Sequence, residues 1–268
     1  IQMSKVRIAH LSDPNFGTVY PQVEKALLKD IEEIAPDLVL ISGDITQRAR
    51  SWQFRAANLF RQQIKQPFFA VPGNHDIPLF NVFGRLLHPY YGFHHYFQAK
   101  RETQLRVKDV CVMGLNSTSR WRHIQGKLDL NRVRDQLLNS WGDAKTRVVM
   151  LHHPLSCRKP EDQGENLLRG IEQTQELFRQ AKVDLVLSGH VHDPWVTTFG
   201  NSVVSTAGTC LSWRTRKDAP NSYHCIDIDS DSHRITVERR DVKDWVFQPV
   251  KGSRKIFAQE ASGWTENL

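Results

Sequence analysis

Five short motifs combine aspartate, asparagine and histidine, the residue types that bind metal ions and transfer protons. Each motif directly follows an apolar run that is typical of a β-strand. The crevice beyond the carboxyl ends of strands is where ligands bind in an α/β sheet, so five strand ends can bring these side chains together. The motifs are Asp13-Pro14-Asn15, Gly43-Asp44, Gly73-Asn74-His75-Asp76, His152-His153-Pro154 and Gly189-His190-Val191-His192.

This mixture of oxygen and imidazole donors indicates a transition-metal site. It suits Mn, Fe or Zn better than Ca²⁺, which prefers oxygen ligands alone. Each motif by itself is weak evidence, because Gly43-Asp44 is usually a turn and His152-His153-Pro154 is usually a surface loop. Gly189–His192 is more informative, since histidines two residues apart can reach neighbouring positions. The ordered set predicts a metal site, because five such coincidences at strand ends are improbable.

Alternating strands and amphipathic helices must position these motifs. The pattern predicts an α/β fold, a layered α/β/β/α sandwich with mixed sheets and the metal site at the C-terminal ends of strands. From Ser202 onward, short strands joined by turns are expected, including Tyr223–Ile228 and Arg234–Arg240. The other expected strands are Val6–Ala9, Leu38–Ile41, Phe68–Val71, Val110–Leu115, Val148–Leu151 and Leu185–Leu187. The expected helices are Val23–Ile34, Trp52–Ile64, Asn131–Trp141 and Thr174–Ala181.

The chain of 268 residues is long enough for one domain with a sizeable core. We expect that domain over residues 1–250 and a loosely held polar tail over 251–268. Two segments do not fit a minimal sandwich, Ile77–Arg106 and Ser156–Gly170. Because both begin directly after a motif, either could cover a site. Residues 77–106 are therefore predicted to be a lid or an insertion.

The composition of the chain indicates which partners it could bind and in which cellular compartment it could function. A formal net charge of +7 favours anionic partners such as phosphate esters, nucleic acid or lipid headgroups. The 4 cysteines have no zinc-ribbon spacing and indicate free thiols, which favours the cytoplasm. No stretch approaches the roughly 20 apolar residues of a membrane span. Peripheral contact with a membrane and a homodimer both stay open.

In this order, the five motifs resemble the D-x-H, GD, GNH(D/E), H and GHxH signature of calcineurin-like metallophosphoesterases. The resemblance runs from about Lys5 to Ala207, and four of the five blocks match fully. Within the family, the chain is most similar to bacterial class III cyclic-nucleotide phosphodiesterases. The strand end at Leu115–Ser117 and the turn Gly126-Lys127-Leu128 support that similarity.

The resemblance implies two metal ions bridged by Asp44. His152 is preferred to His153 because it lies nearest the strand end and matches the single histidine of related members. The first ion would take Asp13, Asp44, His192 and whatever position 15 offers, and the second would take Asp44, Asn74, His152 and His190.

The implied reaction is hydrolysis of a phosphoester by a metal-bound hydroxide. His75 is expected to face the phosphate, where it stabilises charge or protonates the leaving oxygen, and Asn74 would also contact the substrate. Asp76 would hold the ring of His75 in position. The alternative for His75 and Asp76 is a turn capped by polar side chains.

The chain departs from the family signature at Asn15, where the family has histidine. An amide oxygen binds Mn, Fe or Zn more weakly than an imidazole nitrogen does, so the first metal site is the one affected. Three explanations stay open. Asn15 is an engineered change, a natural variant with a different metal preference, or the mark of a degenerate enzyme that only binds.

The substrate implied by the resemblance is a cyclic nucleotide or another small phosphodiester. The apolar and basic residues within 77–106 offer an alternative, a lid for acyl chains beside a pyrophosphate, as in UDP-diacylglucosamine pyrophosphatases of lipid A synthesis. The basic run Trp213–Lys217 places Arg214, with Asn221 nearby, as substrate contacts or as a solvated hairpin. A nuclease of the same superfamily is a further alternative, but no continuous basic face with interleaved aromatics supports nucleic acid.

Overall fold

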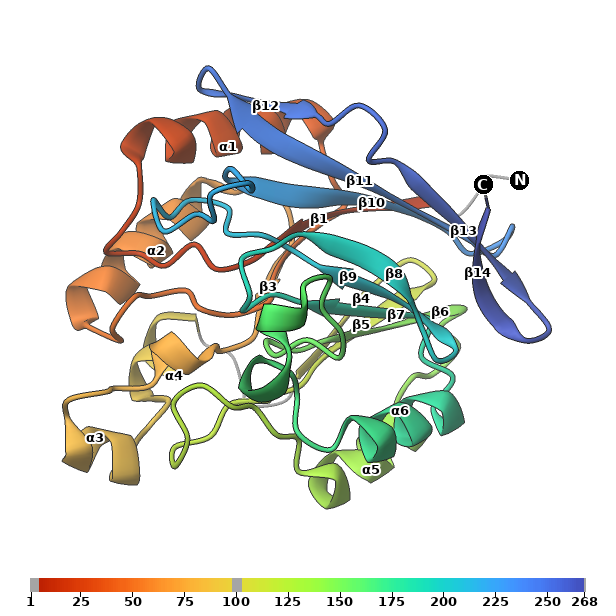
Figure 1. The fold of residues 1–268 in the computed structure, drawn as a ribbon, viewed down its shortest axis with the longest axis horizontal. Coiled ribbons are helices and arrows are strands. Elements are labelled where there is room, and N and C mark those ends of the chain that lie inside the picture. Colours follow the sequence, from red (N-terminus) through yellow and green to blue (C-terminus); the bar gives the residue numbers. More distant parts are fainter. Residues whose placement is uncertain (1–4, 98–102, 268) are drawn as a thin grey trace.

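Two β-sheets lie face to face at the centre of the molecule (Figure 1). This computed structural model describes residues 5–97 and 103–267. The first sheet has the order β14 (Gly263–Asn267), β13 (Lys255–Glu260), β11 (Arg234–Lys243), β10 (Ser222–Asp229), β1 (Lys5–Leu11), β2 (Leu38–Ile41) and β3 (Phe68–Ala70), with β12 (Val246–Pro249) paired to β11. The second has the order β4 (Thr103–Val107), β5 (Val110–Gly114), β6 (Thr146–Met150), β7 (Leu185–Ser188), β9 (Ser202–Thr206) and β8 (Trp195–Phe199).

Both sheets are mixed, as the sequence predicts. Strands β1, β2 and β3 are parallel, and β10 to β14 extend that sheet with antiparallel pairs. Strands β5, β6, β7 and β9 are parallel, flanked by antiparallel β4 and β8. The four residues of β2 are all buried, as expected for a parallel strand covered on both faces.

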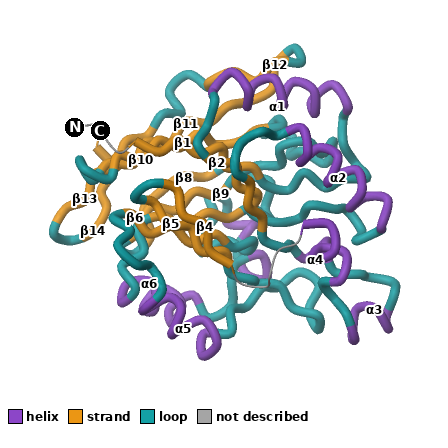
Figure 2. Tube along the Cα trace, turned by 180° about the vertical axis from the view of Figure 1, so that it is seen from behind, coloured by secondary structure: helices purple, strands orange, loops and turns teal. Residues whose placement is uncertain are grey.

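Helices cover the outer face of each sheet (Figure 2). Helices α1 (Pro21–Ile34) and α2 (Ser51–Gln63) pack on the first sheet, and α5 (Leu130–Asn139) and α6 (Ile171–Gln180) pack on the second. A third apolar core fills the space between the sheets. The predicted α/β/β/α sandwich is therefore confirmed.

Helix α1 illustrates how the sequence specifies these elements. Its buried residues Val23, Ala26, Leu27 and Ile31 recur at intervals of three or four, which places them on one face of a helix. Pro21 begins the helix at a position where its missing N–H is not needed. One apolar face against the sheet is enough to fix the position of the helix.

The C-terminal residues are ordered, so the prediction of a loosely held tail is wrong for most of 251–268. Strands β13 and β14 pair with each other, and β13 also pairs with β11. Phe257 and Trp264 are buried in the core between the sheets. The polar residues around these two side chains concealed the strands, because only isolated apolar positions face inward.

The segment 77–106 does not form a single unit. Helix α3 (Val82–Leu87) has no buried residue, whereas α4 (Tyr91–Phe97) contributes the fully buried Phe93 to the core beside α2. Strand β4 begins at Thr103 and forms an edge of the second sheet, and residues 98–102 lie outside the described part. In the connection 156–170, short 3₁₀ turns span Pro160–Asp162 and Gly164–Asn166.

None of the helices within residues 5–97 and 103–267 is long and apolar enough to cross a membrane.

Candidate metal centre

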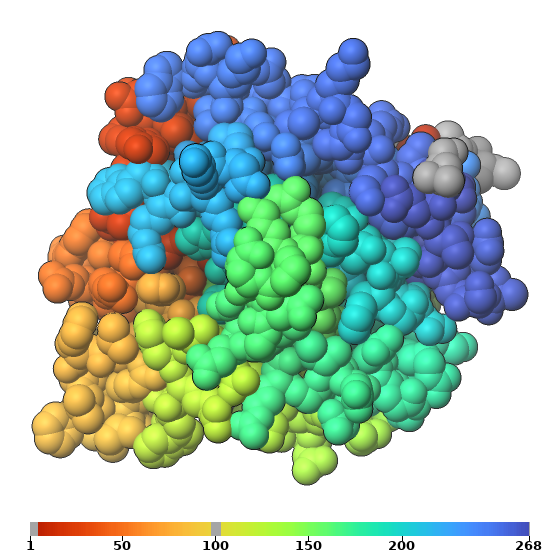
Figure 3. Space-filling model, in the orientation of Figure 1, coloured from red at the N-terminus to blue at the C-terminus, as the bar shows by residue number. Residues whose placement is uncertain are grey.

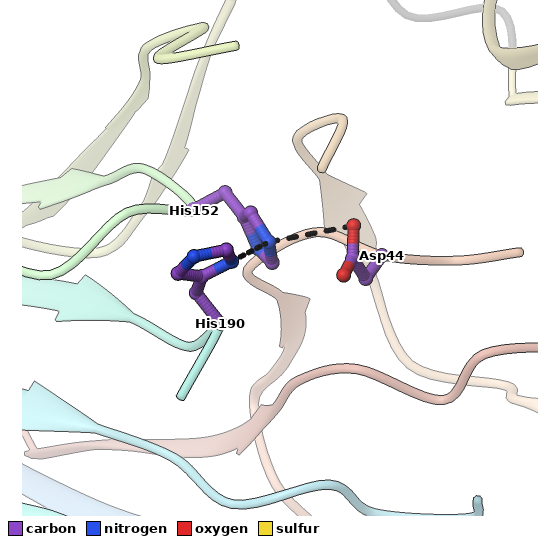
Figure 4. Close-up of side chains that lie close together, drawn as sticks. All are labelled: Asp44, His152 and His190. Carbon is purple, nitrogen blue, oxygen red and sulfur yellow. Dashed lines mark hydrogen bonds and ion pairs between the residues drawn. The ribbon is translucent and has the colours of Figure 1, made fainter. Parts of the chain in front are cut away.

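Three side chains from three different strand ends converge on one point (Figure 4). Asp44 follows β2, His152 follows β6 and His190 follows β7, and one donor atom from each lies within 4.8 Å of the others. Nε2 of His152 lies 3.4 Å from Oδ1 of Asp44 and 3.1 Å from Oδ1 of Asn74. Nδ1 of His190 lies 3.3 Å from the same Nε2. The structure thus brings together the four residues predicted for the second metal.

A hydrogen bond to the backbone fixes the orientation of the His152 ring. Its Nδ1 lies 2.8 Å from the carbonyl oxygen of Ser42, so this nitrogen donates and Nε2 is the nitrogen that faces Asp44. The neighbouring His153 is also buried, but its two ring nitrogens face Ser117 Oγ and the Ile124 carbonyl oxygen, each at 2.8 Å. His152, and not His153, therefore faces the cluster.

Two residues predicted for the first metal, Asp13 and His192, contact each other next to this cluster. Nε2 of His192 is 3.1 Å from Oδ1 of Asp13, and Nδ1 of His192 donates to the carbonyl oxygen of Arg214 at 3.0 Å. The other carboxylate oxygen of Asp13 accepts the backbone N–H of His190 at 3.0 Å. This last bond joins the two halves of the centre.

Asn15 lies beside Asp13 and is fully buried. Its Nδ2 donates to the Asp13 carbonyl oxygen at 3.0 Å, and its backbone N–H donates to the Asp44 carbonyl oxygen at 2.9 Å. Its Oδ1 is buried and has no hydrogen-bond partner among the described residues. An unpaired buried acceptor is costly, and a cation at this position would remove that cost.

The backbone at the site adopts a conformation that L-amino acids rarely take. Five of the predicted ligands have positive φ, namely Asp13 (47°), Asn15 (48°), Asp44 (52°), His190 (75°) and His192 (55°). Each such residue costs on the order of 1 kcal/mol, and such strain gathers at functional sites. It indicates that surrounding packing holds these side chains in place.

Two glycines of the motifs permit the close approach of the loops. A Cβ atom on Gly73 would collide with Oδ1 and the backbone nitrogen of Asp44. A Cβ atom on Gly189 would collide with the side chains of Ser12 and Asp13. Any larger residue at either position would displace a carboxylate of the site.

The electrostatics of the cluster favour cations. Burial opposes the charge of His152, but the carboxylates of Asp44 and Asp13 raise its pKa to about 9. Burial likewise opposes ionisation of Asp44, yet His152 and His75 hold the pKa of Asp44 well below its usual range. Burial lowers the pKa of His190 and keeps this ring neutral, ready to donate a lone pair. Two buried carboxylates, imidazole rings that lie against them and an amide oxygen without a partner together fit a pair of transition-metal ions, which would displace the proton that the carboxylates favour on His152.

His75 borders the cluster, and its ring is held by Gln47. The backbone N–H of His75 donates to Oδ1 of Asp44 at 2.9 Å, and its Nδ1 donates to the Gln47 carbonyl oxygen at 2.9 Å. Nε2 remains on the side of the centre, 4.0 Å from Oδ2 of Asp44. The prediction that Asp76 orients this ring is wrong.

Asp76 instead joins two loops of the site. Its carboxylate accepts the backbone N–H groups of Ile45, Thr46 and Gly73 at 2.8 to 3.0 Å, and the hydroxyl of Thr46 at 2.9 Å. These four bonds occupy the carboxylate, which leaves it no route to the His75 ring. Asp76 therefore stabilises the positions of Asp44 and Asn74 by binding the backbone of the residues next to them.

The two predicted contacts from the basic run differ in position. The guanidinium of Arg214 donates to Oε1 of Gln47 at 2.9 Å, so it lies beside the loop that carries Asp44. Asn221 is buried, and its Nδ2 donates to the carbonyl oxygens of Thr209 and Ser212 at 3.3 and 2.8 Å. The structure thus gives Asn221 a role in holding its own loop rather than an open face toward a substrate.

His123 is a neighbour of the site that the sequence reasoning missed. Its ring centroid lies 5.4 Å from that of His75, and its Nδ1 is buried without a hydrogen-bond partner among the described residues. The signal was a single histidine in a polar loop, which carries no spacing information. Gln47 was also missed, because it holds His75 through its main-chain carbonyl oxygen, which every residue type has.

Comparison with known proteins agrees with this geometry. The family described as calcineurin-like phosphoesterase matches residues 6–194. A probable glycerophosphodiester phosphodiesterase GpdQ of Arcobacter nitrofigilis is 27% identical over 69% of this chain and 68% of that protein. A probable cyclic nucleotide phosphodiesterase of Synechococcus is 25% identical over 80% of this chain and 81% of that protein.

Among solved structures, a purple acid phosphatase from yellow lupin superposes with a TM-score of 0.71 and 15% identity, over 92% of this chain. This chain spans 53% of that plant protein, so the likeness concerns the fold. The family match covers most of the chain and includes all five motifs. With this match, the sequence-based prediction of a phosphoester hydrolase is confirmed, and the chain belongs to the calcineurin-like phosphoesterase family.

Proposed function

We propose that the chain is a binuclear-metal phosphodiesterase that hydrolyses a cyclic nucleotide or another small phosphodiester. The observation that carries this proposal is the convergence of Asp44, His152 and His190 within 4.8 Å, with Asp13 and His192 joined to them through the His190 backbone. The names of the two relatives support a diester, since both are named as phosphodiesterases.

Each residue has a defined part in this proposal. Asp13, Asp44, His192 and Asn15 would hold one ion, and Asp44, Asn74, His152 and His190 the other. Two bound ions supply Lewis acidity and an activated water for in-line displacement at phosphorus. His75 points Nε2 into the site while Nδ1 is held by Gln47, so it is suited to protonate the leaving oxygen or to stabilise charge on the phosphate. Asn74 and Arg214 lie where they can contact the phosphate or the leaving group.

The finer properties are proposals as well. Mixed oxygen and imidazole donors favour Mn, Fe or Zn over Ca²⁺. Cytoplasmic location follows from the free cysteines, and metal analysis and cell fractionation would test the two proposals. A homodimer stays a prediction that light scattering on the purified chain would test.

A second candidate substrate class, an acylated pyrophosphate of the UDP-diacylglucosamine type, is favoured by helix α3. Phe80, Val82, Phe83 and Leu87 in and before this helix are between 59% and 79% exposed. The helix is tied to the loop of His123 by Arg85, whose Nε donates to the Arg120 carbonyl oxygen at 2.6 Å. Apolar and cationic groups near the centre would suit acyl chains beside phosphates, and the same surface would allow peripheral membrane contact.

The test is a panel of substrates assayed with Mn²⁺ on this chain and on its Asn15→His variant. The panel contains cyclic nucleotides, a glycerophosphodiester, bis-p-nitrophenyl phosphate, UDP-diacylglucosamine and single-stranded DNA. We expect diesters to be hydrolysed faster than p-nitrophenyl phosphate, a monoester. Turnover of UDP-diacylglucosamine alone would make the α3 candidate correct, and cleavage of DNA alone would indicate a nuclease. No turnover by either protein, with clearly less than two metals per chain, would indicate a protein that only binds.

A further inference from the structure

A cavity of about 650 Å³ lies apart from the metal centre, at the ends of β5, α5 and α6. None of the predicted metal ligands lines it. Its volume falls within the roughly 300–1,000 Å³ of small-molecule sites. The lining residues that matter are Asn116, Lys127, Asp129, Arg132, Arg169 and Gly170. Helices α5 and α6 lie side by side on the outer face of the second sheet (Figures 1 and 3).

Asn116 is one of the lining residues, and its side-chain amide has a donor that lacks a partner. The side chain is only 3% exposed. Its Oδ1 accepts the backbone N–H of Thr118 at 2.9 Å and the Thr118 hydroxyl at 2.7 Å, which fixes which end of the amide is oxygen. Nδ2 is left buried with no hydrogen-bond partner among the described residues. A buried N–H₂ group without an acceptor costs about 1–3 kcal/mol, so an acceptor in the cavity would be favoured.

Cations surround the same cavity. Lys127 and Arg169 form a parallel β-bridge, and the Arg169 N–H donates to the Gly126 carbonyl oxygen at 2.8 Å. Paired residues of a bridge point to the same face, so two positive side chains stand together, an arrangement that is unfavourable without an anion. Neither makes an ion pair with any residue in the described ranges. Among the lining residues, Asp129 supplies a carboxylate.

The two helix starts differ in a way that favours an anion. Asp129 caps α5 by accepting the Arg132 backbone N–H at 3.3 Å, so that end already has its acceptor. Helix α6, which has 10 residues, is preceded at its N-cap position by Gly170, which has no side chain to cap the helix and has a φ of 74°. The first N–H groups of a helix lack intrahelical partners and attract anions. Gly170 lies on the cavity wall.

We propose that this cavity binds the phosphate group of a small anionic ligand, at a site separate from the metal centre. Asn116 Nδ2, the start of α6 and the Lys127–Arg169 pair would supply its donors. Free phosphate and a phosphate monoester share this chemistry. The proposal does not depend on phosphodiesterase activity, because none of these residues belongs to the metal centre.

The test is calorimetric titration of the metal-loaded full chain with inorganic phosphate and, separately, with AMP. We expect two binding events, one of which disappears in Asp44→Ala and the other in the double variant Lys127→Gln/Arg169→Gln. In that double variant, binding at the second site should weaken by at least about tenfold, as expected for losing charge-assisted hydrogen bonds. Tighter binding of AMP than of phosphate at this site would identify an esterified ligand, and the reverse would identify free phosphate.

Two further variants separate a built site from general charge. Arg134→Gln/Lys182→Gln removes the same charge from α5 and from the end of α6, outside the cavity, and should leave both binding events unchanged. Asn116→Asp keeps the acceptor for Thr118 but replaces the unpaired donor by a carboxylate oxygen, and should weaken the second event alone. A single binding event that Asp44→Ala removes would overturn the proposal, as would equal weakening by the two double variants.

Discussion

The two halves of the metal centre share Asp44 but differ in their ligands. On one side, His152 and His190 bring two imidazole rings next to Asp44 and Asn74. On the other side, His192 places one imidazole against Asp13, and Asn15 supplies an amide oxygen. Imidazole binds Mn, Fe and Zn more tightly than an amide oxygen does. Under the proposed function, we expect the half around Asn15 to be the weaker metal site and to limit the rate.

The hydrogen bonds that orient the histidine rings differ less between the two halves, because each half holds a ring through a backbone carbonyl oxygen. His152 donates to the Ser42 carbonyl oxygen at 2.8 Å, and His192 donates to the Arg214 carbonyl oxygen at 3.0 Å. Both ring orientations are thus fixed before a metal arrives. The proposed halves therefore differ in two ligands, Asp13 in place of Asn74 and Asn15 in place of a second imidazole, and the second difference is testable by substitution at position 15.

The largest effect is expected from Asp44→Ala, which removes the ligand shared by both halves. Hydrolysis should fall by at least about 10⁴-fold, because the positions of both ions and of the activated water depend on this carboxylate. Metal analysis of the purified variant should show loss at both sites. Asp143→Ala is the control, since Asp143 is 90% exposed and precedes β6, whereas His152 follows the other end of that strand. Full metal content in Asp44→Ala would contradict the bridging role.

A pair of substitutions tests the two halves separately. His190→Ala should remove metal from the stronger site, and His192→Ala from the weaker one. Loss of a group that only supports a ligand lowers metal affinity by roughly 10–100-fold. Loss of the ligand itself should lower the affinity of its site by more than that. Titration with Mn²⁺ after chelation would resolve two affinities in the parent chain, and each variant should lose a different one. If both variants lose the same affinity, the two halves are not distinct sites.

His75→Ala should slow turnover by about 10²–10⁴-fold without loss of metal, the range typical of a missing proton-transfer group. The reason is that His75 contacts the cluster through its backbone N–H to Asp44, which alanine retains. Metal content and kcat measured on the same sample give the two readouts. Loss of metal in this variant would show that His75 is a ligand instead.

The structure brings the predicted ligands together because strand ends constrain their positions. Each motif follows a parallel strand that is recognisable from its apolar run, such as Leu38–Ile41 before Asp44, where the predicted and observed bounds agree. Once the strands are parallel neighbours, their C-terminal ends must lie together. Local sequence therefore carried enough information for the fold and for the convergence of these side chains, and their binding of metal stays a prediction.

Contacts made through the main chain could not be predicted. Asp76 was expected to hold His75, but the Gln47 carbonyl oxygen does so, and any residue type could supply a carbonyl. Asn221 has the polar character of a substrate contact, yet its Nδ2 donates to two carbonyl oxygens of its own loop.

Strands β13 and β14 were missed for a different reason. Phe257 and Trp264 are isolated apolar positions within polar surroundings, so the sequence shows no strand pattern there.

The smallest effect, and the sharpest test of the comparison, is expected from Asn15→His. Histidine, like asparagine, is among the residues that tolerate positive φ, so the backbone of position 15 at 48° need not change. Imidazole would replace the amide oxygen that has no hydrogen-bond partner, next to Asp13 and His192. Metal occupancy of the weaker half should rise, with phosphodiesterase activity up at least about tenfold, or roughly 1.4 kcal/mol of barrier.

Measuring metal content and rate separately distinguishes ligand strength from substrate contact at position 15. Asn15→Ala is the matched control, because it removes the amide oxygen without supplying a nitrogen, and it should lower occupancy of the weaker half below that of the parent chain. If Asn15→His binds more metal but is no faster, position 15 acts on the substrate and not on the ion. If the parent chain already holds two metals and Asn15→His is no faster, the two halves are equally strong. The chain would then be an enzyme suited to asparagine, and the difference between the halves would carry no kinetic cost.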